Sequence, residues 1–287
     1  MNRLRPKSAP AASPASPDGE GDVLSALPEG EVHLWFAPSP AEEGDEPAAA
    51  TEGILAGDEI SRLWRIRSAA GRRLFCTGRR LLRGTLSRYG DRSPAEWRFE
   101  TNAHGKPRLA PEAGGSPLAF NISHTAGLVV LAVTCGAEVG VDVERTDRRV
   151  QARRLGDRFF SPREAAALAE LPMERLGERF FHHWTLKEAC LKTLGRGLTL
   201  PLNAIDFALS GEIPFRINWA SAGLPPHAGF RFALVEPRPG YVAAVCLAGG
   251  GPPLVLKGYL VTAGKAMPCP LEPIGQSWPT DSPATRP

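Results

Sequence analysis

The chain has 287 residues, and its 34 Lys and Arg nearly balance its 31 Asp and Glu, so the formal net charge of +3 does not indicate a general polyanion binder. Aliphatic and aromatic residues make up 43% of the sequence, which is typical of a soluble globular protein and excludes a largely disordered or membrane-embedded one. The longest apolar run, near 128–133, is far shorter than the roughly 20 residues of a bilayer-spanning helix, so we expect no transmembrane helix.

The five cysteines are odd in number, lie far apart and form no CxxC pair. This spacing argues against a disulfide framework and against a zinc site. The first residues are basic but lack the apolar segment of a secretory signal. We therefore expect a protein of the reducing cytoplasm.

The charge is distributed unevenly along the chain. Residues 18–59 hold twelve acidic side chains and no Lys or Arg, whereas residues 62–92 hold ten Arg and one acid. Lys, unlike Arg, can lose a proton at moderate cost. Because this chain otherwise uses Arg for positive charge, each position with Lys is a candidate for a specific chemical role. Only six basic residues are Lys: Lys7, Lys106, Lys187, Lys192, Lys257 and Lys265.

The two ends, 1–28 and 263–287, are rich in Pro, Ala, Ser and Gly, and we expect them to be flexible tails. Between them, apolar periodicity predicts a helix from Ala70 to Tyr89. Short β-like runs bounded by turn residues predict several strands. We expect these strands at 32–36, 97–101, 117–123, 127–135, 139–145, 204–209, 215–219, 230–236 and 241–248.

Two further helices follow the strand at 139–145. Ser161 can cap the first, and Glu164 can reach back to it as in a capping box; this helix runs toward Leu171. The second spans about 177–194 and ends at a glycine, as helices often do. Strand and helix do not alternate regularly, so we predict an α+β fold and not a doubly wound one.

The most informative strand reads V-G-V-D-V-E over residues 139–144. Side chains alternate along a strand, so three valines face one side while Asp142 and Glu144 share the other. Two carboxylates on one face repel each other, and a divalent cation such as Mg²⁺ or Mn²⁺ would relieve that repulsion. An ordinary strand with a solvated acidic face is the alternative.

The second signal is W-T-L-K-E-A-C-L-K, residues 184–192, on the last predicted helix. Glu188 and Lys192 are four residues apart and share one face, as in a common intrahelical ion pair. The same geometry would line one wall of a cleft with a carboxylate and an ammonium. Lys187 points about 100° away from that face.

Two turn-like motifs complete the pattern. H-G-K-P, residues 104–107, presents Lys106 at a turn, and F-N-I-S-H-T, residues 120–125, brings Asn121, Ser123 and His124 to a strand end. Hydroxyl, imidazole and ammonium groups gathered in this way suit a phosphate. Each motif alone is also compatible with a simple turn.

Taken together, these motifs resemble the 4′-phosphopantetheinyl transferase superfamily, of the long, surfactin-synthetase-activating kind. The resemblance covers about residues 31–250. Its motifs occur in family order: an Arg-rich segment from Arg73 to Arg83, GKP at 105–107, FNISH at 120–124, VGVDVE at 139–144, RFFSPRE at 158–164, WTLKEACLK at 184–192 and GRGL at 195–198.

The resemblance implies a pseudo-twofold pair of similar α+β subdomains, 29–137 and 138–262, with the active site at their interface. It implies transfer of 4′-phosphopantetheine from coenzyme A to a serine of an acyl or peptidyl carrier protein, releasing adenosine 3′,5′-bisphosphate. By motif match, Asp142, Glu144 and Glu188 would hold Mg²⁺, or Mn²⁺. Glu188 would act as base, and Lys192 would stabilise the departing phosphate.

The same resemblance implies the residues that bind coenzyme A: Arg73, Lys106, Asn121, Ser123, His124, Asp142, Lys187 and Lys192. The chain has Leu74 where family members carry Arg, so Arg73 is the nearest match for the pocket arginine. His182 and His183 receive no role. We expect a monomer whose partner is an acidic apo carrier protein.

Two alternatives belong to other classes. The Arg-rich segment 62–92 is compatible with a nucleic-acid-binding helix in a non-enzymatic protein. Asp142 and Glu144 are also compatible with another metal-dependent phosphotransferase, although that activity leaves GKP and FNISH unexplained. We do not expect nucleic acid to be a partner, because the remaining body is net negative.

Overall fold

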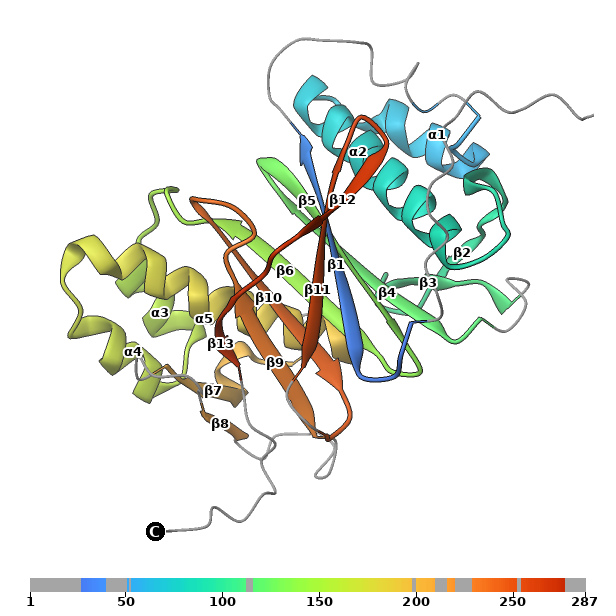
Figure 1. Cartoon of the computed structure of the whole chain (residues 1–287). Coiled ribbons are helices and arrows are strands. Elements are labelled where there is room, and N and C mark those ends of the chain that lie inside the picture. Colours follow the sequence, from blue (N-terminus) through green and yellow to red (C-terminus); the bar gives the residue numbers. More distant parts are fainter. Residues whose placement is uncertain are drawn as a thin grey trace, which may run out of the picture.

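The computed structural model describes residues 27–39, 51, 53–111, 116–197, 200–209, 216–219, 229–251 and 254–276. Two β-sheets pack face to face at the centre, and helices cover their outer sides (Figure 1). No helix in these residues is both long and apolar enough to cross a membrane. The mixture of sheets and helices confirms the predicted α+β class.

The first sheet has the strand order β12-β11-β1-β5-β4, in which β1 and β11 run parallel and the other neighbours antiparallel. The second sheet has the antiparallel order β13-β9-β10-β6. The strands of the first sheet are β1 (Glu31–Ser39), β4 (Leu118–Thr125), β5 (Gly127–Cys135), β11 (Val255–Thr262) and β12 (Lys265–Cys269). Those of the second are β6 (Val139–Arg145), β9 (Phe230–Val235), β10 (Tyr241–Ala248) and β13 (Pro273–Gln276).

Two small hairpins and five α-helices complete the described structure. The hairpins are β2 (Phe99–Thr101) with β3 (Pro107–Leu109), and β7 (Ile205–Ala208) with β8 (Arg216–Trp219). The helices are α1 (Gly57–Arg65), α2 (Ala69–Leu86), α3 (Ala152–Phe159), α4 (Pro162–Ala169) and α5 (Met173–Leu194). Short 3₁₀ turns span Ser87–Tyr89, Pro94–Glu96 and Leu202–Ala204.

Alternating apolar side chains fill the space between the two sheets. Val32, Leu34 and Phe36 of β1 belong to the same buried cluster as Val141 and Val143 of β6. The opposite face of β1 packs with α2, and the opposite faces of β6 and β10 pack with α5. The molecule is therefore layered helix, sheet, sheet, helix, with β6 between the inner core and α5.

The predicted helix start at Ser161 is confirmed. Ser161 Oγ accepts a hydrogen bond from the Glu164 amide, and Glu164 Oε2 accepts one from the Ser161 amide at 2.8 Å. The last helix is longer than predicted, because it begins at Met173, and it ends at Gly195, whose φ of 63° suits glycine. The predicted helix 70–89 becomes α2 followed by a 3₁₀ turn.

Six helices and strands were not predicted from the sequence: α1, α3, β3, β11, β12 and β13. Helix α1 buries only Glu59 and Leu63, so a single apolar residue marks its buried face in the sequence. β12 lies at a sheet edge with mostly exposed side chains and a proline, and it is held by backbone pairing, which leaves no apolar pattern. The expected tail 263–287 is therefore corrected, since it contains β12 and β13; 1–26 and 277–287 lie outside the described residues.

The subdomain boundaries also need correction. β11 belongs to the segment expected in the second half, yet it pairs with β1 from Glu31↔Val255 to Phe36↔Leu260 and extends the first sheet. β12 follows it into the same sheet. The chain therefore returns to its first sheet after completing β6, β9 and β10 of the second.

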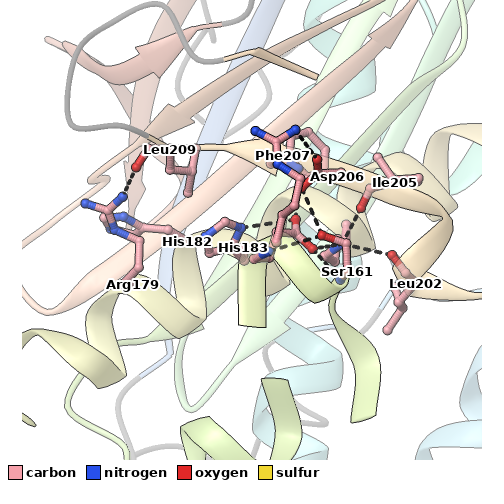
Figure 2. A network of polar contacts seen from close by, with 12 residues as sticks. Ser161, Arg179, His182, His183, Leu202, Ile205, Asp206, Phe207 and Leu209 are labelled. Carbon is pink, nitrogen blue, oxygen red and sulfur yellow. Dashed lines mark hydrogen bonds and ion pairs between the residues drawn. The ribbon is translucent and has the colours of Figure 1, made fainter. Parts of the chain in front are cut away.

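A buried polar network fixes α5 against α4 and β7, as Figure 2 shows. Lys187 on α5 is fully buried, and its Nζ lies 2.7 Å from Glu164 Oε2. The same ammonium donates hydrogen bonds to the carbonyls of Leu202, at 2.9 Å, and Ile205. Glu164 Oε1 accepts from the Phe207 amide at 2.9 Å. A buried ammonium is costly unless paired in this way.

The side chains of His183, Ser161 and Asp206 extend the network in Figure 2. His183 Nδ1 lies 3.2 Å from Glu164 Oε1, and Ser161 Oγ donates to Asp206 Oδ1 at 2.9 Å. Burial raises the pKa of Glu164, but the hydrogen bond from His183 and the Lys187 charge outweigh it, and the pKa falls to about 2. Burial also lowers the pKa of Lys187, an effect that the Glu164 charge opposes. These residues thus act as one electrostatic unit.

The contact between β6 and α5 requires a glycine at position 140. A Cβ at Gly140 would lie 2.1 Å from the Ala189 carbonyl oxygen and 2.5 Å from the Thr193 amide. Backbone atoms of a packed helix cannot move aside cheaply, so no larger residue fits. The glycine of VGVDVE therefore sets how closely α5 approaches the strand that carries Asp142 and Glu144.

We predict that Gly140→Ala lowers the free energy of unfolding by about 1–3 kcal/mol or more, because the new methyl group overlaps the α5 backbone. Urea denaturation measures the change. Gly177→Ala on α5 is the control, since its Cβ would meet nothing within 4 Å. We expect that control to be neutral or stabilising by roughly 0.5–1 kcal/mol. Equal stability of Gly140→Ala and the wild type would contradict the close approach.

We predict that Lys187→Met lowers the free energy of unfolding by about 3–5 kcal/mol, because Glu164 is left as an unpaired buried charge. The exposed pair of Arg108 with Glu100, at 2.7 Å, offers a control. Arg108→Ala should cost at most about 1 kcal/mol, as the loss of an exposed ion pair usually does. Thermal and urea melts of both variants test the difference, and similar losses would refute the assignment.

The Glu164 pKa predicts an acid-dependent stability. Its pKa of about 2 in the folded protein lies below the ordinary glutamate pKa of 4.5, so its contribution to stability is present above pH 4.5 and is lost as the pH falls toward 2. This pKa shift corresponds to a contribution of about 3 kcal/mol to the free energy of unfolding. The difference in the free energy of unfolding between the wild type and Glu164→Gln should therefore become smaller between pH 6 and pH 3 in urea titrations. A constant gap would contradict this prediction.

Candidate functional site

The structure confirms the predicted alternation along β6. Val141 and Val143 lie in the core between the sheets, whereas Asp142 is placed with Glu144 on the side of the strand that α5 covers. Asp142 is buried, with 7% of its surface exposed, and Glu144 is half-buried. Two carboxylates therefore lie beneath the helix that carries Glu188 and Lys192.

Asp142 is the centre of the polar contacts at this place. Its Oδ1 accepts from Ser123 Oγ at 2.9 Å and lies 2.6 Å from Lys192 Nζ, which also donates to Ser123 Oγ at 2.9 Å. The other oxygen, Oδ2, is buried and has no hydrogen-bond partner among the described residues. Such an oxygen is costly to bury and is suited to receive a cation or a donor.

β4 lies beside β6 and bonds to it through side chains. Asn121 Oδ1 accepts from the Val141 amide at 2.9 Å, and Thr125 Oγ1 donates to Glu144 Oε2 at 3.2 Å. Together with Ser123, these residues occupy every second position on β4 and therefore share one face. The edges of the two sheets are thus joined by side chains, and Thr125 is a site residue that the sequence motif did not single out.

Glu144 and Glu188 are held in an environment that disfavours their negative charge. Burial raises the pKa of Glu188, and the negative charge of Asp142 raises it further, while Lys192 lowers it. Burial raises the pKa of Glu144 as well, against the opposing charge of Arg148, whose Nη2 lies 3.5 Å from Glu144 Oε1. The three carboxylates are near enough to repel one another.

The carboxylates do not form a closed metal cage. Within the described ranges, no three His, Cys, Asp or Glu side chains are gathered closely enough to hold a metal ion. Asp142 Oδ2, which has no hydrogen-bond partner among the described residues, and the raised pKa values of Glu144 and Glu188 nevertheless fit a divalent cation. Hard cations prefer carboxylate oxygens.

His124 is exposed on the face of β4 opposite Ser123, the same face as Phe120 and Ile122. Although His124 is exposed, nearby protein atoms partly desolvate its ring and lower its pKa, and the charge of Lys192 lowers the pKa further. The motif FNISH therefore divides its residues between the two faces of the strand. Ser123 contacts Asp142 directly, whereas His124 is coupled to the site only electrostatically.

Lys106 ties the β2–β3 hairpin to the C-terminal end of α5. Its Nζ lies 2.5 Å from Glu138 Oε2, 3.1 Å from the Val139 carbonyl and 3.2 Å from the Thr193 carbonyl. Asn102 Nδ2 donates to the Gly195 carbonyl at 2.7 Å. The GKP turn therefore holds the C-terminal end of α5 next to the start of β6. Lys106 is not among the contacts of Asp142 that the described residues make.

The prediction that Lys187 binds phosphate needs correction. Its ammonium is fully buried and its hydrogen bonds go to Glu164 and to the Leu202 and Ile205 carbonyls. The sequence could not distinguish a buried from an exposed lysine on this helix. Arg73 lies half-buried on α2.

His183 receives a structural role through its contact with Glu164, and its neighbour His182 lies 3.8 Å from Glu178 Oε1. Burial lowers the pKa of His182 to about 4, so this imidazole is neutral at pH 7. Among the contacts of the described residues, neither histidine pairs with Asp142 or Lys192.

Part of the Arg-rich segment is used within the fold. Arg83 is 1% exposed, its Nη2 lies 2.8 Å from Glu59 Oε2, and its Nη1 donates to the Pro94 and Trp97 carbonyls. Arg79 Nε lies 3.4 Å from Glu59 Oε1. A nucleic-acid-binding helix would present its guanidinium groups to solvent, so these two arginines do not support that alternative.

Comparison with known proteins agrees with the geometry. A family model of the 4′-phosphopantetheinyl transferase superfamily matches residues 138–246, from the start of β6 through most of β10. The 4′-phosphopantetheinyl transferase HetI of Nostoc sp. is 36% identical over 224 residues, covering 77% of this chain and 89% of that protein.

Two further relatives extend the match. The 4′-phosphopantetheinyl transferase Sfp of Bacillus subtilis is 32% identical, covering 58% of this chain and 70% of its own. A phosphopantetheinyl transferase of Thraustochytrium sp. is 29% identical, covering 70% of this chain and 74% of its own. On the extent and identity of these matches, the chain belongs to the 4′-phosphopantetheinyl transferase superfamily.

Proposed function

We propose that the chain transfers 4′-phosphopantetheine from coenzyme A to a serine of an apo carrier protein and releases adenosine 3′,5′-bisphosphate. The relatives HetI and Sfp are named for this activity. The observation that carries the proposal is Asp142, whose Oδ2 is buried without a partner while Oδ1 is held by Ser123 and Lys192. This carboxylate lies within the range matched by the family model.

Asp142, Glu144 and Glu188 would hold Mg²⁺, or Mn²⁺ in its place. Their mutual repulsion and the open oxygen of Asp142 support this choice. When bound, the cation would neutralise charge on the pyrophosphate of coenzyme A. Ser123 and Lys192 would keep the Asp142 carboxylate in a fixed orientation.

Lys192 and Glu188 would serve the transfer step. The acceptor serine hydroxyl is a poor nucleophile, and Glu188 is the carboxylate on α5 that would accept its proton. Attack of the serine oxygen on the β-phosphorus of the pyrophosphate breaks the bond to the bridging oxygen, which leaves with adenosine 3′,5′-bisphosphate. Lys192 would stabilise the negative charge on that leaving group. Positioning and charge neutralisation should dominate, as in phosphoryl transfer generally.

The remaining phosphate contacts are proposed for Arg73, Ser123 and His124, which lie on α2 and β4. Lys106 would join them only by exchanging its contact with Glu138 for a phosphate oxygen. Asn121 supports the site indirectly, because its side chain holds the Val141 amide next to Asp142. We also propose that the protein acts as a cytoplasmic monomer on an acidic carrier protein.

We predict that Asp142→Ala and Glu188→Gln each reduce transfer by at least about 10²-fold while the protein stays folded. The assay mixes the enzyme with an apo carrier protein, coenzyme A and Mg²⁺, and mass spectrometry detects the gain of one phosphopantetheine. Omission of the metal tests its requirement. Glu174→Gln, an exposed carboxylate on the first turn of α5, is the control and should retain wild-type transfer.

The outcome has two decisive alternatives. Transfer at the wild-type rate by either variant would show that the residue assignment is wrong. Absence of transfer by the wild type to a panel of fatty acid, polyketide and peptide synthetase carriers would refute the proposed activity.

A further inference from the structure

The hairpin turn that joins β4 to β5 lies next to the carboxylates of the candidate site. β4 ends at Thr125, which pairs with Leu128 of β5, so the turn consists of Ala126 and Gly127. Thr125 Oγ1 donates a hydrogen bond to Glu144 Oε2 at 3.2 Å. The orientation of the Glu144 carboxylate therefore depends on how this turn is held.

The sequence of the turn does not fix its geometry. Two-residue hairpin turns favour types I′ and II′, in which the first central residue has a positive φ. Here Gly127 has a φ of 86°, whereas the φ of Ala126 is not positive. These signs match a type II turn, which fits the twist of two paired strands less well. We therefore expect a contact from outside the hairpin to hold the turn.

Tyr241 makes such a contact from the second sheet. Its hydroxyl donates a hydrogen bond to the Ala126 carbonyl at 3.0 Å. A Cβ at position 127 would lie 2.6 Å from the same hydroxyl oxygen, so a side chain there would push the hydroxyl away. Gly127 thus serves both the positive φ and the close approach of Tyr241.

The Tyr241 side chain is itself well anchored. Its ring packs against the apolar cluster between the two sheets. The guanidinium groups of Arg238 and Arg145 lie 5.5 Å and 6.0 Å from the ring centroid. The backbone of Tyr241 pairs with that of Arg145, the neighbour of Glu144 on β6. Tyr241 therefore starts beside Glu144 on the second sheet and reaches the turn that follows Thr125 on the first.

Glu144 can keep its bond to Thr125 and still bind a cation. A carboxylate has two oxygens and about four acceptor positions, so one hydrogen bond to Oε2 leaves the others open. Oε1 lies 3.5 Å from Arg148, whose side chain is 56% exposed, and such a pair is weak. Of these two contacts, the hydrogen bond from Thr125 does more to orient Glu144.

We propose that Tyr241 is a positioning residue for the candidate metal site. Its hydroxyl fixes the β4–β5 turn, and Thr125 then keeps the Glu144 carboxylate in one orientation for a divalent cation. Both residues act through Glu144 and are not ligands themselves. This inference rests on the proposed function and adds two residues to the machinery that the metal requires.

Binding of Mn²⁺ alone to the full chain tests the proposal, and electron paramagnetic resonance of the free ion measures the Kd. Thr125→Val keeps the shape of the side chain but removes the donor. It should weaken Mn²⁺ binding by about tenfold, as the loss of a group that orients a metal ligand typically does. Thr125→Ser keeps the hydroxyl and should bind Mn²⁺ with nearly the wild-type Kd. Tyr241→Phe removes only the hydroxyl and should weaken binding by a smaller factor.

The double variant tests the order of the contacts. If Tyr241 acts through Thr125, Tyr241→Phe should not weaken Mn²⁺ binding further when it is added to Thr125→Val. An undiminished further loss would overturn the proposed route. Tyr259→Phe is the matched control, because Tyr259 stacks on Trp35 and lies on β11, which β1 and β5 separate from β4. It should leave the Kd for Mn²⁺ unchanged.

The remaining outcomes separate this inference from the proposed function. A wild-type Kd in Tyr241→Phe, even with a lower stability in urea melts, would show that the hydroxyl serves the fold alone and would overturn the positioning role. Wild type that transfers phosphopantetheine but binds no Mn²⁺ would also overturn it, with the activity intact. Wild type that binds Mn²⁺ but modifies no carrier would instead overturn the proposed function.

Discussion

The orientation of α5 depends on one buried ammonium group. Lys187 cannot leave its pocket without separating an ion pair in the protein interior, and its acceptors on α4 and near β7 allow one helix rotation only. Glu188 is the next residue and points about 100° away, toward the side on which Lys192 contacts Asp142. A structural charge on one side of the helix therefore sets the direction of the candidate catalytic groups on the other.

The second determinant is the junction between the two sheets. β4 and β6 belong to different sheets, and side chains of β4 make the contacts that backbone pairing would otherwise make. Asn121, Ser123 and Thr125 bond in turn to Val141, Asp142 and Glu144. Because this joint passes through the carboxylates themselves, their positions are tied to the packing of both sheets. The same residues thus serve the stability of the fold and the geometry of the site.

Features that depend on neighbouring residues alone, such as the alternation along a strand and the start of a helix, could be predicted from the sequence. The alternation of side chains along a strand predicted that Asp142 and Glu144 share one face, and the capping-box pattern predicted the contact of Ser161 with Glu164. Burial is a long-range property, so the sequence could not show that Lys187 would be enclosed by residues from α4 and β7. For the same reason α1 escaped prediction: it is held by the pair of Glu59 with Arg83, residues that a periodicity argument treats as surface.

The retained lysines now have a geometric explanation that differs from phosphate binding alone. An ammonium is a compact tetrahedral donor of three hydrogen bonds, whereas guanidinium is planar. Lys187 reaches one carboxylate and two carbonyls, and Lys106 likewise reaches Glu138 and the Val139 and Thr193 carbonyls. In both cases the three acceptors converge on a single nitrogen, which suits an ammonium, whereas buried Arg83 meets Glu59 and two carbonyls through separate nitrogens of its planar group. Lys192, which contacts Asp142 and Ser123, is the motif lysine whose partners belong to the candidate site, and it is therefore the one on which phosphate chemistry should depend.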